Sequence, residues 1–251
     1  DRLYYELKQE EKLHNLRYIY PSMMRRPYKN KDYLLIVFSS DRGLAGSFNY
    51  TVAKAAIQRI DELEAEGINV KVICIGKKAY DIIRRTHEKN IDEYRDDLGK
   101  KGADYKEMKS FGFKILNRFN GRDIDVVEVI TSKFISAINR EVVPRQVLPI
   151  ILTKPEEFEQ DPSMVDNAAY EYESDKMTML TETLALLFRA FIFQAMVHSQ
   201  ASEHSARMTS MDNATRNAQD IIKNLTLKYN GIRQSAITTE LIEIIAGAEA
   251  V

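Results

Sequence analysis

The sequence MTSMDNATRNAQDIIKNLTLKYNGIRQSA (residues 208–236) carries small or apolar side chains at steps of three and four residues, which places them along one side of a helix. The stripe consists of Met211, Ala214, Ala218, Ile221, Leu225, Tyr229, Ile232 and Ala236. It belongs to a longer stretch, residues 175–247, that contains no proline and whose single interior glycine is Gly231. An unbroken helix of that extent would be about 110 Å long. Because no domain of this chain could match that length, the helix is expected to pack against a partner helix, a partner protein or both.

The composition of this helix changes along its length. Over residues 195–218 the stripe is filled by Ala, Ser, His and Thr, which bury little area and are expected to hold only weakly without a partner helix. The end of the chain, ITTELIEIIAGAEAV (residues 237–251), is apolar and acidic and has no basic residue. Such a terminus is expected to lie inside a sheath of other chains. A generic coiled-coil scaffold is the alternative that the periodicity alone leaves open.

The preceding part of the chain alternates between strand-like and helix-like segments. Residues 33–38, YLLIVF, form a continuous apolar run typical of a strand that is covered on both faces. Further strands are predicted at residues 70–75, 124–131 and 142–151, and helices at residues 48–66, 77–89 and 104–119. Residues 91–98 are ambiguous, and residues 134–141 are predicted to connect two strands. The order predicts an α/β fold, a doubly wound and mostly parallel sheet, followed by the long C-terminal helix.

Composition excludes several classes of protein. The 251 residues are 44% hydrophobic and 29% charged, but the net charge is only −1, which gives no reason to expect nucleic acid as a partner. The single cysteine, Cys74, lies in the apolar run VICIG and is predicted to be buried in a strand, and one chain cannot form a disulfide with it. No run of about 18 apolar residues is apparent, so the chain is not expected to span a membrane.

The turn SSDRGLAGS (residues 39–47) joins the first predicted strand to a helix, the position where nucleotide-binding folds hold phosphate. Its spacing matches neither GxGxxG nor GxxxxGK[ST], and Asp41 would repel a phosphate. A tight turn with an Asp41–Arg42 charge pair or cap is therefore preferred. An α/β enzyme or nucleotide-binding protein that uses residues 41–46 is the alternative.

Catalytic and metal-binding patterns are scarce. His198 and His204 lie six residues apart, on different faces of a helix, while His14 and His87 have no cysteine or carboxylate cluster at ligand spacing. No GxSxG motif occurs. We therefore expect no catalytic residue, no metal site and no cofactor.

Two segments carry a resemblance to a known family. ASEHSARMTSMDNATRNAQDIIKNLTLKYNGIRQSAITTELIEIIAGAEAV (residues 201–251) resembles the C-terminal helix of the gamma subunit of F-type ATP synthases, and SSDRGLAGSFN (residues 39–49) resembles a motif in the globular domain of the same family. That family begins with a long N-terminal helix that winds antiparallel against the C-terminal one. Residues 1–20 resemble only the tail of that helix, so most of the partner helix is expected to be absent from this chain.

The resemblance divides the chain into five parts. They are the helix tail at residues 1–20, a linker at 21–32, the α/β domain at 33–160, a boundary segment at 161–175 and the long helix at 176–251. It implies a central rotor shaft, a non-catalytic subunit present as a single copy, that couples rotation of the membrane c ring by proton flow to conformational changes of the catalytic beta subunits. The implied partners are the alpha and beta subunits, the epsilon subunit and the c ring. The implied place is the cytoplasmic side of a bacterial inner membrane.

Particular residues match family positions that contact partners. RQxxITxE places Arg233, Gln234, Thr238 and Glu240 at positions that contact the beta subunits, and ARM adds Arg207. Without the resemblance, these polar side chains would be interpreted as a solvated helix face. Tyr170, Glu171 and Tyr172 match the foot of the shaft against the c ring, and the alternative for them is a short edge strand.

Overall fold

The computed structural model describes residues 7–8, 21–24, 32–98, 102–136, 139–151 and 175–249. The strands are β1 (Asp32–Phe38), β2 (Asn69–Ile75), β3 (Ile91–Arg95), β4 (Val126–Phe134) and β5 (Arg140–Leu148). The α-helices are α2 (Phe48–Ala65), α3 (Lys77–His87), α4 (Tyr105–Asn120) and α5 (Lys176–Glu249), and short 3-10 turns cover Ser22–Met24 and Glu88–Asn90. Most of the predicted helix tail and all three predicted foot residues, Tyr170, Glu171 and Tyr172, lie outside the described residues.

The five strands form one sheet in the order β3-β2-β1-β4-β5. β1 pairs in parallel with β2 and β4, β2 pairs in parallel with β3, and β5 is antiparallel to β4. The chain crosses from β1 outward to β3 and then returns to β4 on the other side of β1, which is the topology of a doubly wound sheet. The predicted α/β fold, with a mostly parallel sheet and a long C-terminal helix, is confirmed.

β3 occupies the segment that was ambiguous from its sequence. It lies at an edge of the sheet, where acidic side chains are tolerated because they reach solvent and basic partners. Glu93 accepts a 2.7 Å hydrogen bond from Lys114, and Asp92 accepts one of 2.6 Å from Arg118. Both partners lie on α4, so the polar composition that obscured this strand also attaches it to a helix.

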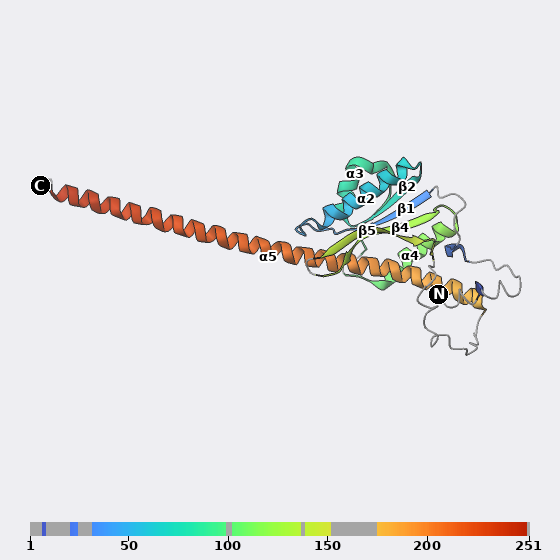
Figure 1. Ribbon diagram of the computed structural model, residues 1–251. Coiled ribbons are helices and arrows are strands. Elements are labelled where there is room, and N and C mark those ends of the chain that lie inside the picture. Colours follow the sequence, from blue (N-terminus) through green and yellow to red (C-terminus); the bar gives the residue numbers. More distant parts are fainter. Residues whose placement is uncertain are drawn as a thin grey trace.

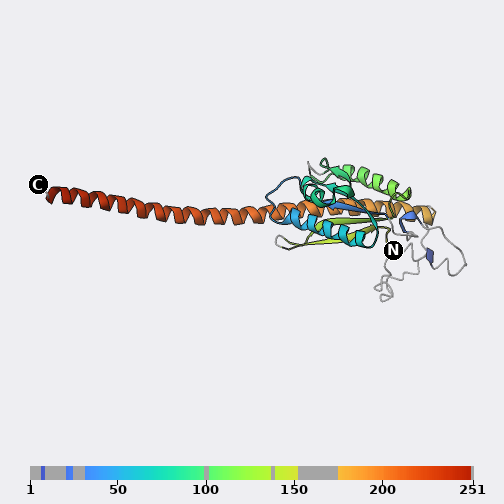
Figure 2. The same cartoon turned by 90° about the horizontal axis from the view of Figure 1, so that it is seen from above.

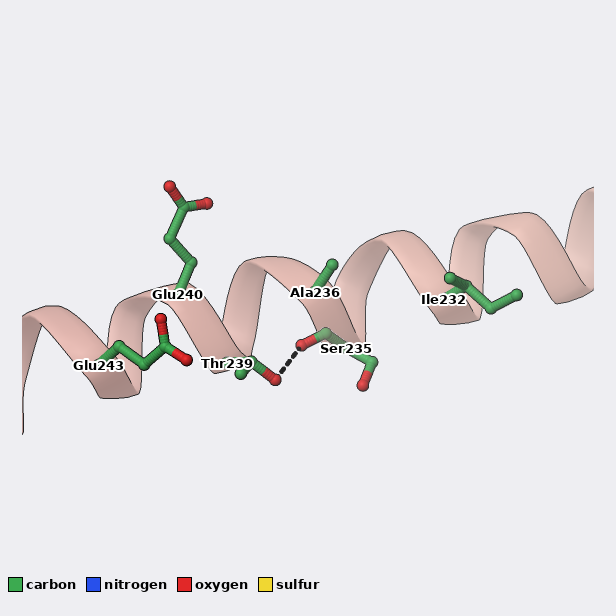
Figure 3. A pocket seen from close by; sticks show the side chains of 6 residues that line it. All are labelled: Ile232, Ser235, Ala236, Thr239, Glu240 and Glu243. Atoms are coloured by element: carbon green, nitrogen blue, oxygen red, sulfur yellow. Dashed lines mark hydrogen bonds between the residues drawn. The ribbon is translucent and has the colours of Figure 1, made fainter.

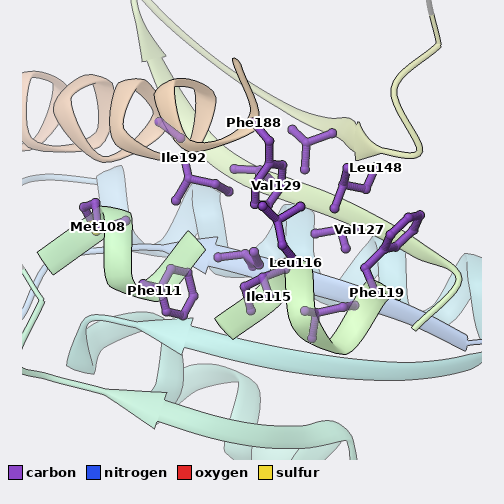
Figure 4. Packing of buried hydrophobic residues seen from close by; sticks show 14 of the residues in the cluster. Met108, Phe111, Ile115, Leu116, Phe119, Val127, Val129, Leu148, Phe188 and Ile192 are labelled. Carbon is purple, nitrogen blue, oxygen red and sulfur yellow. The ribbon is translucent and has the colours of Figure 1, made fainter. Parts of the chain in front are cut away.

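Two hydrophobic cores lie on the two faces of the sheet. Leu35 and Val37 of β1 face the core that α2 and α3 cover, whereas Leu34 and Ile36 face the core that α4 and α5 cover. This double coverage explains the continuous apolar run of β1. Figure 4 shows the second core, where Phe188 and Ile192 of α5 meet side chains of α4 and β4.

The helix α5 is 74 residues long and has two distinct parts. Its first part packs along the α/β domain and buries Leu184, Phe188 and Ile192, whereas the rest projects far beyond the domain (Figures 1 and 2). From Met211 to Ala248 every residue is exposed except Asn230, which is partly exposed. In the described part of the chain, the α/β domain therefore leaves roughly half of α5 uncovered.

One 18-residue window of α5 has a mean hydropathy of 1.5, so the helix is long and apolar enough, by length and composition, to cross a membrane. This criterion does not decide whether the helix crosses a membrane, and the expectation that the chain does not span one stays a prediction. A third of the window, 33%, is buried inside the structure. Within α5, the large apolar side chains of Leu184, Phe188 and Ile192 are buried in the core that α4 and β4 share.

The small residues of α5 are not all available for a partner helix. Ala195, Ser199, Ser202 and Ala206 are buried, where a weakly held coiled-coil stripe was expected over residues 195–218. Their small size allows α5 to approach the strands closely, and the Ser202 hydroxyl donates a 2.9 Å hydrogen bond to the backbone oxygen of Ser132 on β4. For the exposed remainder of that segment the expectation stays a prediction.

Candidate functional site

The turn after β1 is held by its own polar groups. The Ser40 backbone N–H donates to Asn49 Oδ1 at 3.0 Å, and the Ser40 hydroxyl donates to the Arg42 backbone oxygen at 2.7 Å. Asp41 accepts a 2.9 Å hydrogen bond from the Lys77 N–H at the start of α3. Asp41 therefore bonds the start of α3 and not of α2, and no ion pair between Asp41 and Arg42 is present among the described residues. This carboxylate occupies the N-terminus of α3, whereas the phosphate position considered from the sequence is the N-terminus of α2.

The same turn meets α5 at Arg207. The Arg207 guanidinium donates a 3.4 Å hydrogen bond from Nη2 to the Gly43 backbone oxygen and forms a 2.7 Å ion pair with Glu203. Ala45 and Ala206, both buried, belong to the same core beside this contact. The two segments that carried the family resemblance thus touch each other. Sequence reasoning missed this contact, because 164 residues separate its two partners.

The other four predicted contact residues, Arg233, Gln234, Thr238 and Glu240, all lie on the projecting part of α5 and are exposed. The Thr238 hydroxyl donates a 2.8 Å hydrogen bond to the Gln234 backbone oxygen within the helix. Among the described residues, Arg233 and Glu240 form no ion pair, so their charged groups are available to another chain. The structure places these four within two turns of one helix and separates them from Arg207.

A shallow hollow lies on one side of this part of α5 (Figure 3). It is lined by Ile232, Ser235, Ala236, Thr239, Glu240 and Glu243. Glu240 was among the predicted contact residues, and Ile232 and Ala236 belong to the apolar stripe predicted from the sequence. Ser235, Thr239 and Glu243 were missed, although steps of three and four along the sequence could have identified them. The side chains combine an apolar floor with two carboxylates, so a complementary surface would be apolar with hydrogen-bond donors or cations at its rim.

A second cleft, of about 400 Å³, lies between β4, β5 and α5. Lys133, Glu141, Arg145 and His198 contribute its charged and titratable groups, and the Arg145 guanidinium lies 4.9 Å from the centre of the Phe191 ring. Within the described ranges, no group of three or more His, Cys, Asp or Glu residues could hold a metal ion. Among the described side chains that line the cleft, no nucleophile and base lie at hydrogen-bonding distance from each other.

Comparison with known proteins covers almost the entire chain. The family profile described as ATP synthase matches residues 3–251, a range that includes both the turn and α5. The ATP synthase gamma chain of Rhodospirillum rubrum is 39% identical over 225 residues, which cover 89% of this chain and 75% of the relative. That of Paracoccus denitrificans is 38% identical over 230 residues, covering 92% and 77%.

The chain belongs to the ATP synthase gamma chain family. The resemblance predicted from two segments of the sequence is thereby confirmed over nearly the whole chain. Solved structures support the fold of this family member. A chain of the Euglena gracilis mitochondrial ATP synthase has a TM-score of 0.60 at 17% identity, covering 99% of this chain and 86% of that chain. A chain of the central stalk and c ring of the Tetrahymena thermophila enzyme has a TM-score of 0.55 at 19% identity, covering 82% and 86%.

Proposed function

We propose that this gamma chain is the central rotor shaft of an F-type ATP synthase. In this role it couples rotation of the membrane c ring, driven by ion flow, to conformational changes of the catalytic beta subunits in ATP synthesis or hydrolysis. The chain itself catalyses no reaction. The family membership supports the assignment to this complex, and the geometry of α5 supports the assignment to its axis.

One observation carries the proposal: the uncovered length of α5. The helix projects about 60 Å beyond Arg207, at about 1.5 Å per residue. Large apolar side chains remain exposed along it, among them Ile222 at 63% and Ile244 at 62%. Burying one such side chain is worth about 1.5–3 kcal/mol, so the projecting part requires a sheath of other chains. A ring of alpha and beta subunits would supply that sheath.

The partner contacts form the finer part of the proposal. Arg233, Gln234, Thr238 and Glu240 contact the beta subunits in turn, because they are exposed on the projecting helix and their side chains are polar. Arg207 contributes at the point where the helix leaves the domain. Tyr170, Glu171 and Tyr172 of the boundary segment, residues 161–175, form the foot on the c ring, and the epsilon subunit is a further partner. An antiparallel N-terminal helix completes a coiled coil with α5.

The complex is proposed to contain one copy of this chain and to lie on the cytoplasmic face of a bacterial inner membrane, since the relatives compared above include bacterial gamma chains. Residues 33–160 form the globular unit of the rotor and residues 176–251 the shaft in this proposal. A generic coiled-coil scaffold would instead associate with further copies of itself.

The test is reconstitution of the chain with alpha and beta subunits from the same organism. A probe attached through Lys54→Cys, an exposed position on α2, should rotate in one direction when MgATP is added. Native mass spectrometry should find one copy of this chain in each complex. Homodimers of the chain, together with failure to join alpha and beta subunits, would favour the scaffold and reject the proposal.

A further inference from the structure

The last contacts between α5 and the α/β domain form a set of directed hydrogen bonds. The collar, as we name it, consists of Gly43, Thr131, Ser132 and Arg140 of the domain and Ala195, Ser202 and Arg207 of α5. The Thr131 hydroxyl donates to the Ala195 backbone oxygen at 3.0 Å, and the Ser202 hydroxyl donates to the Ser132 backbone oxygen at 2.9 Å. Arg140 Nη1 donates to the Ser202 backbone oxygen at 3.3 Å, and Arg207 Nη2 donates to that of Gly43 at 3.4 Å.

These hydrogen bonds are made on two sides of the helix. Ala195 and Ser202 lie seven residues apart, which places them within about 20° of each other around the helix axis. Arg207 lies five residues beyond Ser202, about 140° around the axis at 3.6 residues per turn. β4 and β5 therefore hold one side of α5, and the turn after β1 holds another. A helix held on two sides cannot roll about its own axis without breaking bonds on both.

The side chains at this level provide little other resistance to rolling. Ala195, Ser199, Ser202 and Ala206 are small, and burial of such side chains is a non-directional interaction. Apart from Met196, which is buried next to Ala195, the large interlocking side chains of α5, Leu184, Phe188 and Ile192, lie farther back along the helix. Hydrogen bonds depend on angle as well as distance, so they resist rotation where small side chains do not. Ion pairing with Glu203 at 2.7 Å also holds the Arg207 guanidinium in place.

We infer that the collar is the torque-bearing joint between the globular domain and the projecting helix, an inference that rests on the proposed rotor function. Thr131, Ser202 and Arg207 are positioning residues in this joint: they fix the angle at which α5 leaves the domain. Without them, the stretch between Met196 and Arg207 twists as a free helix and adds its torsional flexibility to that of the projecting part.

The experiment measures torsional stiffness in the complete complex. Lys223→Cys on the projecting helix is cross-linked to a cysteine in the surrounding subunits, and thermal angular fluctuations of a probe at Lys54→Cys are recorded. The free length between collar and cross-link is about 24 Å with an intact collar and about 40 Å when only residues up to Met196 are held. Since angular variance grows with free length, variants that remove the collar bonds should raise this variance up to about 1.7-fold.

Two variants separate the joint from contacts with other subunits. Thr131→Val combined with Ser202→Ala removes two hydrogen bonds without enlarging either side chain. Because Ser202 is fully buried, a larger angular variance in this variant cannot come from the loss of a contact between Ser202 and another subunit. Arg207→Ala is measured separately. The matched control combines Thr215→Ala with Arg216→Ala. These substitutions remove one hydroxyl hydrogen bond and the ion pair between Arg216 and Asp212, both of which lie within α5. The control should leave the variance unchanged.

Each substitution is also measured alone, so that one variant that fails to assemble does not remove the test. Unchanged variance in a chain that combines Thr131→Val, Arg140→Ala, Ser202→Ala and Arg207→Ala, and so lacks all four bonds, would overturn the inference. An increase of the variance that Arg207→Ala alone accounts for would also overturn it. A wild-type chain that never rotates under MgATP rejects the rotor function itself. A wild-type chain that rotates, combined with collar variants of normal stiffness, rejects only the joint.

Discussion

Arg59 of α2 and Glu128 of β4 form a bidentate ion pair, with 2.8 Å between Arg59 Nε and Glu128 Oε2 and 2.7 Å between Nη2 and Oε1. The Glu128 side chain is only 7% exposed, so its charge lies inside the contact between helix and sheet. The hydrogen bonds to Glu128 raise the pKa of the Arg59 guanidinium further above its ordinary value. Because the carboxylate accepts two charge-assisted bonds, it remains compatible with a buried strand.

The first prediction is that Arg59→Ala destabilises the domain strongly. It leaves the Glu128 carboxylate buried without its partner, which typically costs about 3–5 kcal/mol. Chemical denaturation followed by a signal from the α/β domain measures the free energy of unfolding. The matched control is Arg216→Ala, which breaks an exposed ion pair with Asp212 and should cost less than about 1 kcal/mol. Equal effects of the two substitutions would mean that burial of Glu128 contributes nothing.

The second prediction concerns pH. Burial raises the pKa of the Cys74 thiol from its ordinary 9.0 to about 12. Between these values the unfolded chain loses this proton and the folded chain keeps it, so the stabilising contribution is complete below about pH 9 and declines as pH rises toward 12. The slope for this one group is up to about 1.4 kcal/mol per pH unit.

Cys74→Ala removes that group and should flatten the decline in unfolding free energy between about pH 9 and pH 11. The comparison of slopes is needed because tyrosines and lysines titrate in the same range. The folded wild-type chain should also resist thiol reagents at neutral pH, since Cys74 is buried. Parallel pH profiles for the two chains would contradict the burial argument.

The structural elements that could be predicted from the sequence are those whose residue pattern lies within one continuous segment. The buried strand β1 and the helix α5 were predicted correctly, because a continuous apolar run and a 3.6-residue period each lie within one segment. The edge strand β3 was ambiguous, since its acidic residues are balanced by Lys114 and Arg118 on a distant helix. The small residues of α5 were expected to pack in a coiled coil. Small side chains allow close approach to a helix and to a sheet alike, so the sequence does not distinguish the two. The contact from Arg207 to Gly43 has no local signal at all.

The third prediction concerns the turn between β2 and α3. Gly76 has a φ of 97°, and a Cβ atom built there would lie 2.2 Å from the Ser39 backbone oxygen. Gly76→Ala should therefore destabilise the domain by at least about 1–3 kcal/mol, the usual cost of such backbone strain. The control is Gly231→Ala, which lies in the exposed part of α5 with nothing within 4 Å of the added Cβ. It should increase helicity by circular dichroism, because Ala is favoured over Gly in a helix by about 1 kcal/mol.

The fourth prediction tests the proposed contacts of Arg233 and Gln234 with the beta subunits. Both side chains are exposed on the projecting part of α5, where nothing in the described chain requires them for folding. Replacing both by Ala removes hydrogen bonds that are worth about 1.5–3 kcal/mol each when a charged group is buried in an interface. Ile232 and Ala236 on the neighbouring face are unchanged, and Ala is a strong helix former, so α5 should persist by circular dichroism.

We therefore expect a reconstituted complex that assembles but hydrolyses ATP more slowly, because each contact that distinguishes one angle of the shaft from another contributes to coupling. Steady-state hydrolysis measures the rate, and native mass spectrometry verifies assembly. The matched control is Lys223→Ala with Asn224→Ala, a basic and an amide residue nearly three turns earlier on the same exposed helix. Unchanged turnover in the Arg233 and Gln234 variant would remove these residues from the coupling mechanism. Loss of assembly would identify them as anchors that hold the shaft in the complex, and coupling through these two side chains would then be rejected.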